Sequence, residues 1–327
     1  MIEYPRLRHF DDGIAMVVTD LHGEGLVFDH IMQTFFDLLE SGKADRLILC
    51  GDLIHIRRAV PDDSLRMMME VIKWQKKLGE DTITMLMGNH EMPHVYNITL
   101  AKGRDEFTAP FEKALTKYGT RDEVYKFLRG LPIYVTTNAG VLISHAGATP
   151  AVTKAHEAQN ILTFDHDALL QLGEDRLLNS VDIEQLKSDK NYLRQAMTFT
   201  GVTGIDDPRF HHMLRGQILS QGEDEFEFLW DVLFARNEQK WGVEAYTFIA
   251  EEFLQAIGDV TENILNVVVA GHIGTIGGHQ LVGKKHLRLS SFAHAHPNDT
   301  GEYLLLDCAT KINMATDLLP HLRPVYK

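Results

Sequence analysis

Five short segments of the chain carry side chains that bind metal ions well, and each follows an apolar run typical of a buried strand. Glycine stands beside these polar residues or one position away. The candidate ligands are Asp20 and His22, Asp52, Asn89, His145 and His272. In α/β sheets, binding sites form outside the carboxyl ends of the strands, and glycine allows the tight turns needed there. We therefore expect the candidate ligands to converge on one place.

The chemistry of this set favours transition metals. Asp, Asn and His together form a mixed oxygen and nitrogen donor set that suits Mn, Fe or Zn. Six side chains are too many for one such ion with an open position, but they suit two ions about 3.5–4 Å apart that share a carboxylate. Neither cysteine lies among them, which argues against a structural zinc site. A single strand-end histidine is usually a structural residue, whereas the joint pattern favours a metal centre.

The elements that must position these residues follow from hydrophobic periodicity. Apolar runs typical of strands alternate with segments in which apolar residues have helical spacing. Strands are expected at 14–19, 46–50, 83–87, 133–136, 141–144, 265–270, 287–291 and 303–307. Helices are expected at about 26–40, 63–77, 108–118, 121–129 and 243–257. This alternation predicts a layered α/β fold.

The stretch from 149 to about 221 has a different pattern. It is polar, poor in strand-like runs and helical in tendency at 151–162, 167–172 and 183–197. We interpret it as a mostly helical insertion that covers the site. The expected organisation is therefore a single domain, 1–327, with this insertion.

Composition narrows the classes of partner. The 46 acidic residues outnumber the 32 basic ones, for a net charge of −14, which disfavours a nucleic-acid partner. No apolar run approaches the roughly 20 residues that span a bilayer, and the N-terminus has no secretory apolar core. We expect no membrane partner and a cytoplasmic location. Cys50 and Cys308 end apolar runs, so buried free thiols in a reducing compartment are expected.

Taken in order, the five segments resemble a known family. They read Asp20-Leu-His22-Gly23, Gly51-Asp52, Gly88-Asn89-His90-Glu91, His145-Ala-Gly147 and Gly271-His272. This pattern is similar to that of the calcineurin-like metallophosphoesterases, and most similar to the phosphoprotein phosphatase branch. The resemblance covers about 15–150 and 225–308, and Leu131-Pro132 and Leu229-Trp230-Asp231 also look like that branch.

The resemblance implies a four-layer α/β/β/α sandwich and a role for each matched residue. Asp20, His22 and Asp52 would hold the first metal. Asp52 would bridge to the second metal, whose ligands would be completed by Asn89, His145 and His272. A metal-bridged hydroxide would attack phosphorus in line. His90 would be the general acid for the leaving oxygen, and Glu91 would support a ligand or shape the turn. The expected cofactors are two divalent ions, with manganese favoured over iron or zinc.

The turn after Asp52 departs from the pattern of this branch. After Asp52, His55 stands where the branch has an Asp that orients the catalytic histidine, and Ile56 stands where it has a phosphate-binding Arg. Arg57 or Arg58 would then contact phosphate, and Arg236 is a further candidate; Arg215 is a weaker one. Gly274 stands where many phosphodiesterases of the wider family have a further histidine ligand; the absence of that ligand is a feature of the phosphoprotein phosphatase branch and leaves the first metal a water-filled position. His294 and His296 are expected to belong to a loop near the site entrance.

Two enzymatic functions and one binding function are compatible with this pattern. The first is a phosphomonoesterase similar to the protein phosphatases, acting on a phosphoprotein or a small phosphoester. The second is a hydrolase of dinucleoside polyphosphates or other small phosphoesters that uses the same metals. The third is a metal-binding scaffold without turnover, which an intact ligand set disfavours.

Overall fold

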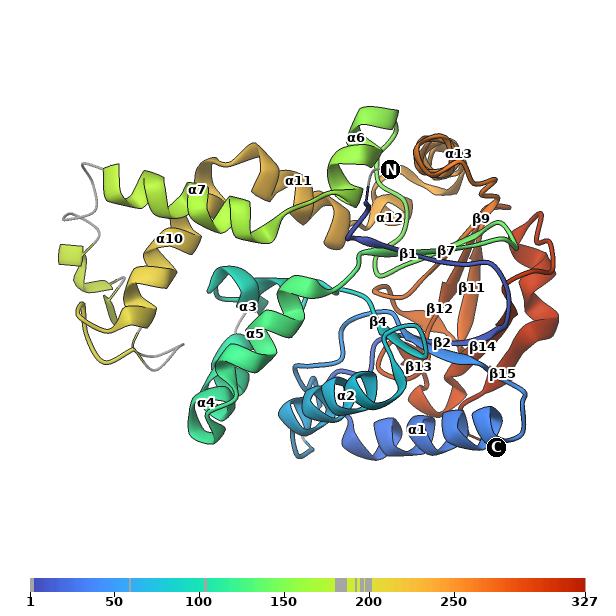
Figure 1. Ribbon diagram of the computed structural model, residues 1–327, viewed down its shortest axis with the longest axis horizontal. Coiled ribbons are helices and arrows are strands. Elements are labelled where there is room, and N and C mark those ends of the chain that lie inside the picture. The colour runs from blue at the N-terminus through green and yellow to red at the C-terminus, as the bar shows by residue number, and fades with distance from the viewer. Residues whose placement is uncertain are drawn as a thin grey trace. The chain divides into compact units, whose positions relative to one another are not determined.

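The computed structural model describes residues 3–58, 60–102, 105–179, 187–191, 193–194, 197 and 202–326. The chain divides into two compact units (Figure 1). The first comprises Met1–Asn89, Leu131–Phe164 and Trp230–Lys327, and the second comprises His90–Gly130 and Asp165–Leu229. The expected insertion at 149–221 overlaps both units, and its place within a single domain stays a prediction. Part of the helix expected at 183–197 lies outside the described residues.

Two mixed sheets form the centre of the first unit. The six-stranded sheet has the order β1 (Leu7–Phe10), β7 (Tyr134–Thr137), β8 (Val141–Ser144), β9 (Val267–Ala270), β12 (His286–Leu289) and β11 (His279–Val282). The five-stranded sheet has the order β15 (Leu322–Pro324), β14 (Glu302–Asp307), β2 (Ile14–Val18), β3 (Arg46–Leu49) and β4 (Ile83–Met85). The strands β1, β11 and β15 were not expected from the sequence.

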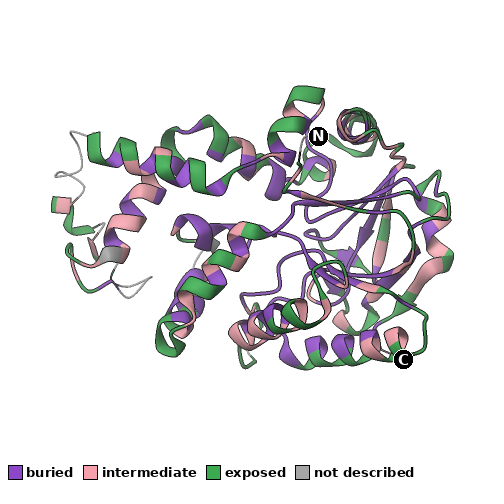
Figure 2. Ribbon diagram, viewed as in Figure 1, coloured by how far each residue is buried: buried purple, intermediate pink, exposed green. Residues whose placement is uncertain are grey.

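The hydrophobic core joins the two sheets. Ala15, Val17 and Ile48 of the five-stranded sheet cluster with residues of the six-stranded sheet such as Ile143 and Val269. The central strands are buried along nearly their whole length, as Figure 2 shows. Strands covered on both faces require near-continuous apolar sequences, which is why they were recognisable as apolar runs.

Helices cover the outer faces of both sheets. Helices α1 (Gly25–Glu40) and α2 (Ser64–Leu78) pack against β3 and β4, while α13 (Val243–Thr261) packs against β9 and against α6 (Ala155–Leu162). In α1, the buried residues Phe28, Ile31, Met32 and Phe35 have the i, i+3, i+4, i+7 spacing of one helix face. The predicted four-layer α/β/β/α sandwich is confirmed (Figure 1).

Strand direction brings the candidate ligands to common edges. β2, β3 and β4 are mutually parallel, as are β8, β9 and β12. The carboxyl ends of parallel neighbours lie at the same edge of a sheet, so the turns after β2 and β3 are neighbours, and so are those after β8 and β9. Cys50 and Cys308, both in the core, are free and buried, as expected.

The second unit is mainly helical. Its helices are α3 (Met92–Tyr96), α4 (Thr108–Tyr118), α5 (Arg121–Gly130), α7 (His166–Asn179), α10 (Pro208–Gly222) and most of α11 (Asp224–Leu233), beside the short strands β5 (Ala101–Lys102) and β6 (Asp105–Glu106). Phe210 and Leu214 of α10 form a small core with Leu177 of α7. In the described part of the chain, no helix is both long and apolar enough to cross a membrane.

Candidate metal centre

The candidate ligands lie in the turns that follow the strands. Asp20 and His22 follow β2, Asp52 follows β3, Asn89 follows β4, and the remaining two histidines, His145 and His272, follow β8 and β9. All six are buried, with exposed fractions between 1% and 6%. Burial of this many polar side chains requires partners, and their partners are largely one another.

The backbone at these positions is unusual. Asp20, His22, Asp52 and His272 have φ values of 43°, 45°, 50° and 70°. Residues other than glycine rarely adopt this left-handed region, and such strain concentrates at functional sites. The neighbouring Gly51 permits close approach of two turns, since a Cβ there would lie 2.6 Å from the backbone nitrogen of Gly88. The turns therefore hold the side chains in a conformation that the isolated segments would not prefer.

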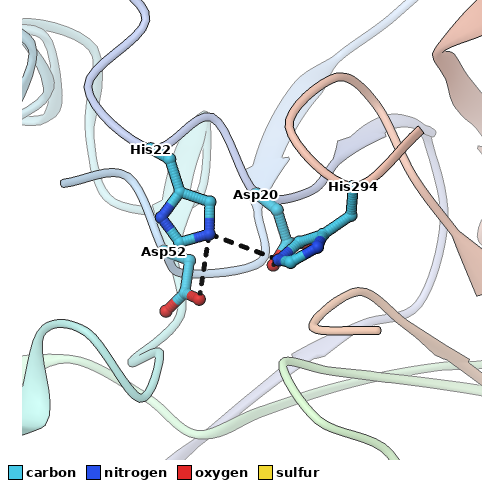
Figure 3. Close-up of side chains that lie close together, drawn as sticks. All are labelled: Asp20, His22, Asp52 and His294. Atoms are coloured by element: carbon cyan, nitrogen blue, oxygen red, sulfur yellow. Dashed lines mark hydrogen bonds and ion pairs between the residues drawn. The ribbon is translucent and has the colours of Figure 1, made fainter. Parts of the chain in front are cut away.

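The first group of ligand atoms contains Asp20, His22, Asp52 and His294, all within 4.8 Å of one another (Figure 3). His22 Nε2 lies 3.5 Å from Asp52 Oδ2 and 3.3 Å from His294 Nε2. His294 Nε2 also lies 3.6 Å from Asp20 Oδ1. Four donor side chains thus face one point. The sequence predicted three of them, and His294 is the fourth.

The second group contains Asp52, His145 and His272, again within 4.8 Å of one another. His145 Nε2 lies 3.5 Å from Asp52 Oδ1. The side-chain oxygen of Asn89 lies 2.8 Å from His145 Nε2 and 2.9 Å from His272 Nδ1. Asp52 belongs to both groups and offers a different oxygen to each, which is the arrangement expected of a bridging carboxylate.

Backbone carbonyls orient two of the histidines. His145 Nδ1 lies 2.8 Å from the carbonyl oxygen of Cys50, and His22 Nδ1 lies 3.3 Å from that of Ile54. A carbonyl can only accept, so each ring donates from Nδ1 and presents the lone pair of Nε2 to the cluster. A hydrogen bond from the second ring nitrogen is the usual way in which proteins fix the tautomer of a metal-ligating histidine.

The electrostatics of the cluster favour a cation. Burial, together with the charge of Asp52, raises the pKa of Asp20 to about 7, although His145 opposes the shift. Burial lowers the pKa of His22 and of His272 well below the usual value. The site therefore combines neutral imidazoles with two closely spaced carboxylates that repel each other. A divalent cation removes this repulsion, so the donor set fits divalent metal ions.

A buried arginine connects the two turns that carry the histidines of the second group. Arg288 is 1% exposed, and its Nη1 donates to the carbonyl oxygen of Ala146, at 3.0 Å, and to that of Gly271. These carbonyls belong to the residues next to His145 and His272. Glu238, from α12 (Asn237–Trp241), forms an ion pair with the other end of the guanidinium. Arg288 thus fixes the spacing of two histidine-bearing turns without being a ligand.

The predicted arginines have different environments. Arg57 Nη1 donates to His294 Nε2 at 3.1 Å, which places this guanidinium beside the first group. Arg58 forms a two-point ion pair with Glu24. The charge of Arg236 contributes to lowering the pKa of His272 and of His294, so Arg236 also lies near the cluster.

The remaining predicted residues lie around the cluster or next to it in the chain. His55 is buried with φ of 72°, and its backbone amide donates to Ser64 Oγ at 2.9 Å. His90 and Glu91 directly follow Asn89 and are buried at the start of the second unit, where the ring of His90 lies 5.4 Å from that of Phe107. Their proposed roles rest on this chain position.

Among the residues that the structure describes, His294 is a candidate ligand that the sequence pattern does not identify. Its spacing to His296 suggested a loop, and His296 is indeed exposed. The available signal was indirect: Gly274 stands where the wider family has a further histidine, which leaves the first group one donor short. Only the fold shows that the loop after β12 supplies a donor from another direction.

Comparison with known proteins identifies the family. The family described as "Calcineurin-like phosphoesterase" matches residues 15–296. The chain belongs to the calcineurin-like phosphoesterases and is a phosphoester hydrolase that depends on metal ions. No curated protein sequence matches it.

Solved structures that are similar to this chain have low sequence identity to it. A protein serine/threonine phosphatase from Saccharomyces cerevisiae, with similarity to human phosphatase PP5, is 15% identical over 98% of this chain and 82% of its own, with a TM-score of 0.52. A cold-active protein-tyrosine phosphatase of a psychrophilic Shewanella species is 16% identical over 94% of this chain and 78% of its own, with a TM-score of 0.47.

Proposed function

We propose that this chain is a phosphomonoesterase with two divalent metal ions. The observation that supports this most strongly is the position of Asp52, whose two carboxylate oxygens face two separate groups of donors. Asp20, His22 and His294 would complete one site, and Asn89, His145 and His272 the other. We favour manganese, because the mixed oxygen and nitrogen donors suit it.

Divalent ions in such a site supply Lewis-acid charge and lower the pKa of water. The protein supplies the positioning of the phosphoryl group. Arg57 is the best-placed guanidinium, because it lies beside the first group and its partner, the lone pair of His294 Nε2, is the one that a metal would use. Metal binding would therefore release Arg57 to bind phosphoryl oxygens, while Arg58 stays with Glu24. Arg236, whose charge acts on His272 and His294, would be a further phosphate ligand.

His90 is the proposed proton donor. The leaving alkoxide of a phosphomonoester needs a proton, and histidine is suited to deliver one near neutral pH. Its support is its chain position directly after the ligand Asn89 and its burial at 7% exposure. The neighbouring Glu91 and the buried His55 would orient groups around the ligands rather than contact substrate.

A second substrate class uses the same chemistry. Dinucleoside polyphosphates and other small phosphoesters would bind the same metals, and the departures at His55 and Ile56 make the phosphate-binding turn unlike that of the protein phosphatases. The order of the motifs and the Leu229-Trp230-Asp231 segment support the phosphomonoester.

Turnover of p-nitrophenyl phosphate with added Mn²⁺ tests the proposal. We expect activity in the wild type and its loss in Asp52→Asn. The Asp299→Asn variant removes an exposed carboxylate and serves as the control. A second assay compares a phosphopeptide with diadenosine tetraphosphate. Faster turnover of the dinucleotide would replace the phosphomonoester with the second substrate class, and full activity of Asp52→Asn would contradict both.

A further inference from the structure

The second unit contains a cavity of about 580 Å³ that the metal centre does not explain. Its walls come from α3, α5, α7 and α10, and all of its lining residues belong to this unit. The volume lies within the range of about 300–1,000 Å³ typical of small-molecule sites. Side chains of Arg121, Arg129 and Arg215 line it together with the ring of Tyr125.

Two of the three guanidiniums have close counter-ions. Arg121 Nη1 lies 2.5 Å from Glu112 Oε2 and donates to the hydroxyl of Tyr125 at 3.0 Å. Arg129 Nε lies 3.1 Å from Asp167 Oδ1. These two arginines are therefore held in place by the fold itself.

Arg215 is more buried than these two arginines, and its ion pair is longer. Its side chain is only 15% exposed, and its nearest carboxylate, Glu174, is 3.7 Å away. The other oxygen of Glu174 lies 2.6 Å from His211 Nε2. The buried Nε of Arg215 has no hydrogen-bond partner among the residues that the structure describes. Burial lowers the pKa of this guanidinium, and the charge of Arg129 lowers it further, although Glu174 opposes both effects. Arg215 is therefore paired more loosely than the other two arginines, and its Nε is a buried donor without an acceptor.

The side chain of Arg215 cannot easily turn away. Its stem crosses α7 at Gly173, where a Cβ would lie 2.9 Å from Arg215 Cγ. The next residue, Gly216, packs on α3, with its Cβ position 2.2 Å from the carbonyl oxygen of Tyr96. Two glycines thus fix α10 against α7 and α3 and hold the guanidinium at the cavity.

The remaining lining suits a small organic anion. Asp122 and Asp167 also line the cavity but are exposed, so solvent and salt screen their charges. Asn97 and Gln171 supply amide groups, while Val95 and Leu170 supply apolar surface. Three guanidiniums therefore line the cavity against two exposed carboxylates and the partly buried Glu174, and its walls can accommodate a body larger than the anionic group.

We propose that this cavity binds a small molecule through an oxyanion, a phosphate or a carboxylate, that pairs with Arg215. The anion supplies the hydrogen-bond acceptor that Arg215 Nε lacks and adds a closer counter-charge than Glu174, which lies 3.7 Å from Nη1. The site is formed by the second unit alone, so it is distinct from the metal centre of the first unit.

Hydrogen–deuterium exchange of the full chain with added inorganic phosphate tests the site, because it reports which helices the ion protects. We expect slower exchange in α5 and α10 of the wild type and of Asp52→Asn, whose metal centre is impaired. Arg215→Gln should need about tenfold more phosphate for the same protection, since a charge-assisted hydrogen bond contributes about 1.5–3 kcal/mol. Lys117→Gln removes an exposed charge from α4 and should behave as the wild type.

Acetate and phosphate in parallel titrations distinguish the two oxyanions: protection by acetate alone assigns a carboxylate site. If Arg215→Gln fails to fold, Arg129→Gln at the cavity wall replaces it, with an expected weakening of a few-fold. Unchanged exchange in α5 and α10 with both anions, or equal protection in the wild type and the arginine variant, would overturn the proposal.

Discussion

The backbone amide of His272 donates a hydrogen bond to the carboxylate of Asp20, with both carboxylate oxygens 3.0 Å from the nitrogen. The two residues belong to different donor groups, so this bond couples the groups through the backbone. Gly271 makes it possible, because a Cβ at this position would lie 2.0 Å from Asp20 Oδ2.

We expect Gly271→Ala to displace the carboxylate of Asp20 and to weaken metal binding at the first group. Overpacking of this kind also destabilises a fold by about 1–3 kcal/mol. Metal content by atomic emission after dialysis, with thermal unfolding in parallel, measures both effects. Gly222→Ala is the matched control, since its Cβ would meet nothing within 4 Å. Full metal content in Gly271→Ala would show that Asp20 can move without loss of the ion.

His294→Asn tests the donor that only the fold revealed. We expect metal affinity at the first group to fall by at least about tenfold, because even residues that merely orient a ligand contribute about 10–100-fold. The second group should keep its ion. Competitive titration with a chelator measures the two affinities. The exposed His296→Asn provides a control two residues away, and equal affinities in both variants would remove His294 from the ligand set.

Glu238→Gln tests whether Arg288 holds the two turns that carry His145 and His272. The substitution leaves the guanidinium of Arg288 buried without its ion-pair partner, which should lower the free energy of unfolding by about 3 kcal/mol. Because Arg288 holds the carbonyls beside His145 and His272, we also expect weaker binding at the second group. Denaturant unfolding and chelator competition measure the two effects. If only stability falls, then Arg288 supports the fold and does not position the histidines.

Glu112 should make the stability of the second unit depend on pH. Burial raises its pKa, but the hydrogen bond from His94, at 2.5 Å, and the charges of His94 and Arg121 outweigh burial and lower it below the usual value. A lowered folded-state pKa contributes stability that is complete above the unfolded-state pKa and is lost as the pH falls through the folded-state value.

Urea unfolding of the wild type, Glu112→Gln and Glu225→Gln at a series of pH values between about 6 and about 3 checks this expectation. The wild type should lose stability steadily on acidification, whereas Glu112→Gln should start lower and change less. Glu225 is exposed, so its variant should follow the wild type. Parallel curves for the wild type and Glu112→Gln would contradict the assignment.

His90→Asn tests the proton donor separately from the metals. We expect the rate with p-nitrophenyl phosphate, whose leaving group hardly needs a proton, to fall less than the rate with an alkyl phosphate, by a difference of about tenfold or more. Metal content should be unchanged. Equal losses with both substrates would indicate that His90 acts in another way.

Much of the fold was readable from the sequence because its central strands are buried on both faces. The apolar runs that form β2, β3, β8 and β9 are continuous, so each predicts a strand clearly. Each run is followed by a turn with glycine and a polar residue. Edge strands such as β1 and β15 were missed, since their residues are partly exposed and carry no continuous apolar pattern. The division into two units depends on packing between segments distant in the chain, which periodicity does not report.

The candidate residues that follow apolar strand-like runs could be predicted from the sequence, whereas those in other positions could not. Asp20, Asp52 and His145 each lie in the turn that follows a strand, so a local pattern identifies them. His294 and Arg288 have no such pattern: one lies in a loop after β12, and the other acts through the carbonyls of distant residues. Their positions follow from the pairing of β12 with β9, a long-range contact.

The proximity of His22 and His294 also affects how the protein assembles. The two residues are 272 positions apart in the chain, so an ion held by both is a cross-link that closes a loop of that length. A chain still being synthesised can bury β2 against β3 long before it contains His294. The first group of donors is therefore completed only after His294 has been synthesised, and intermediates that contain β2 and β3 but not His294 gain no stability from an ion held by both histidines.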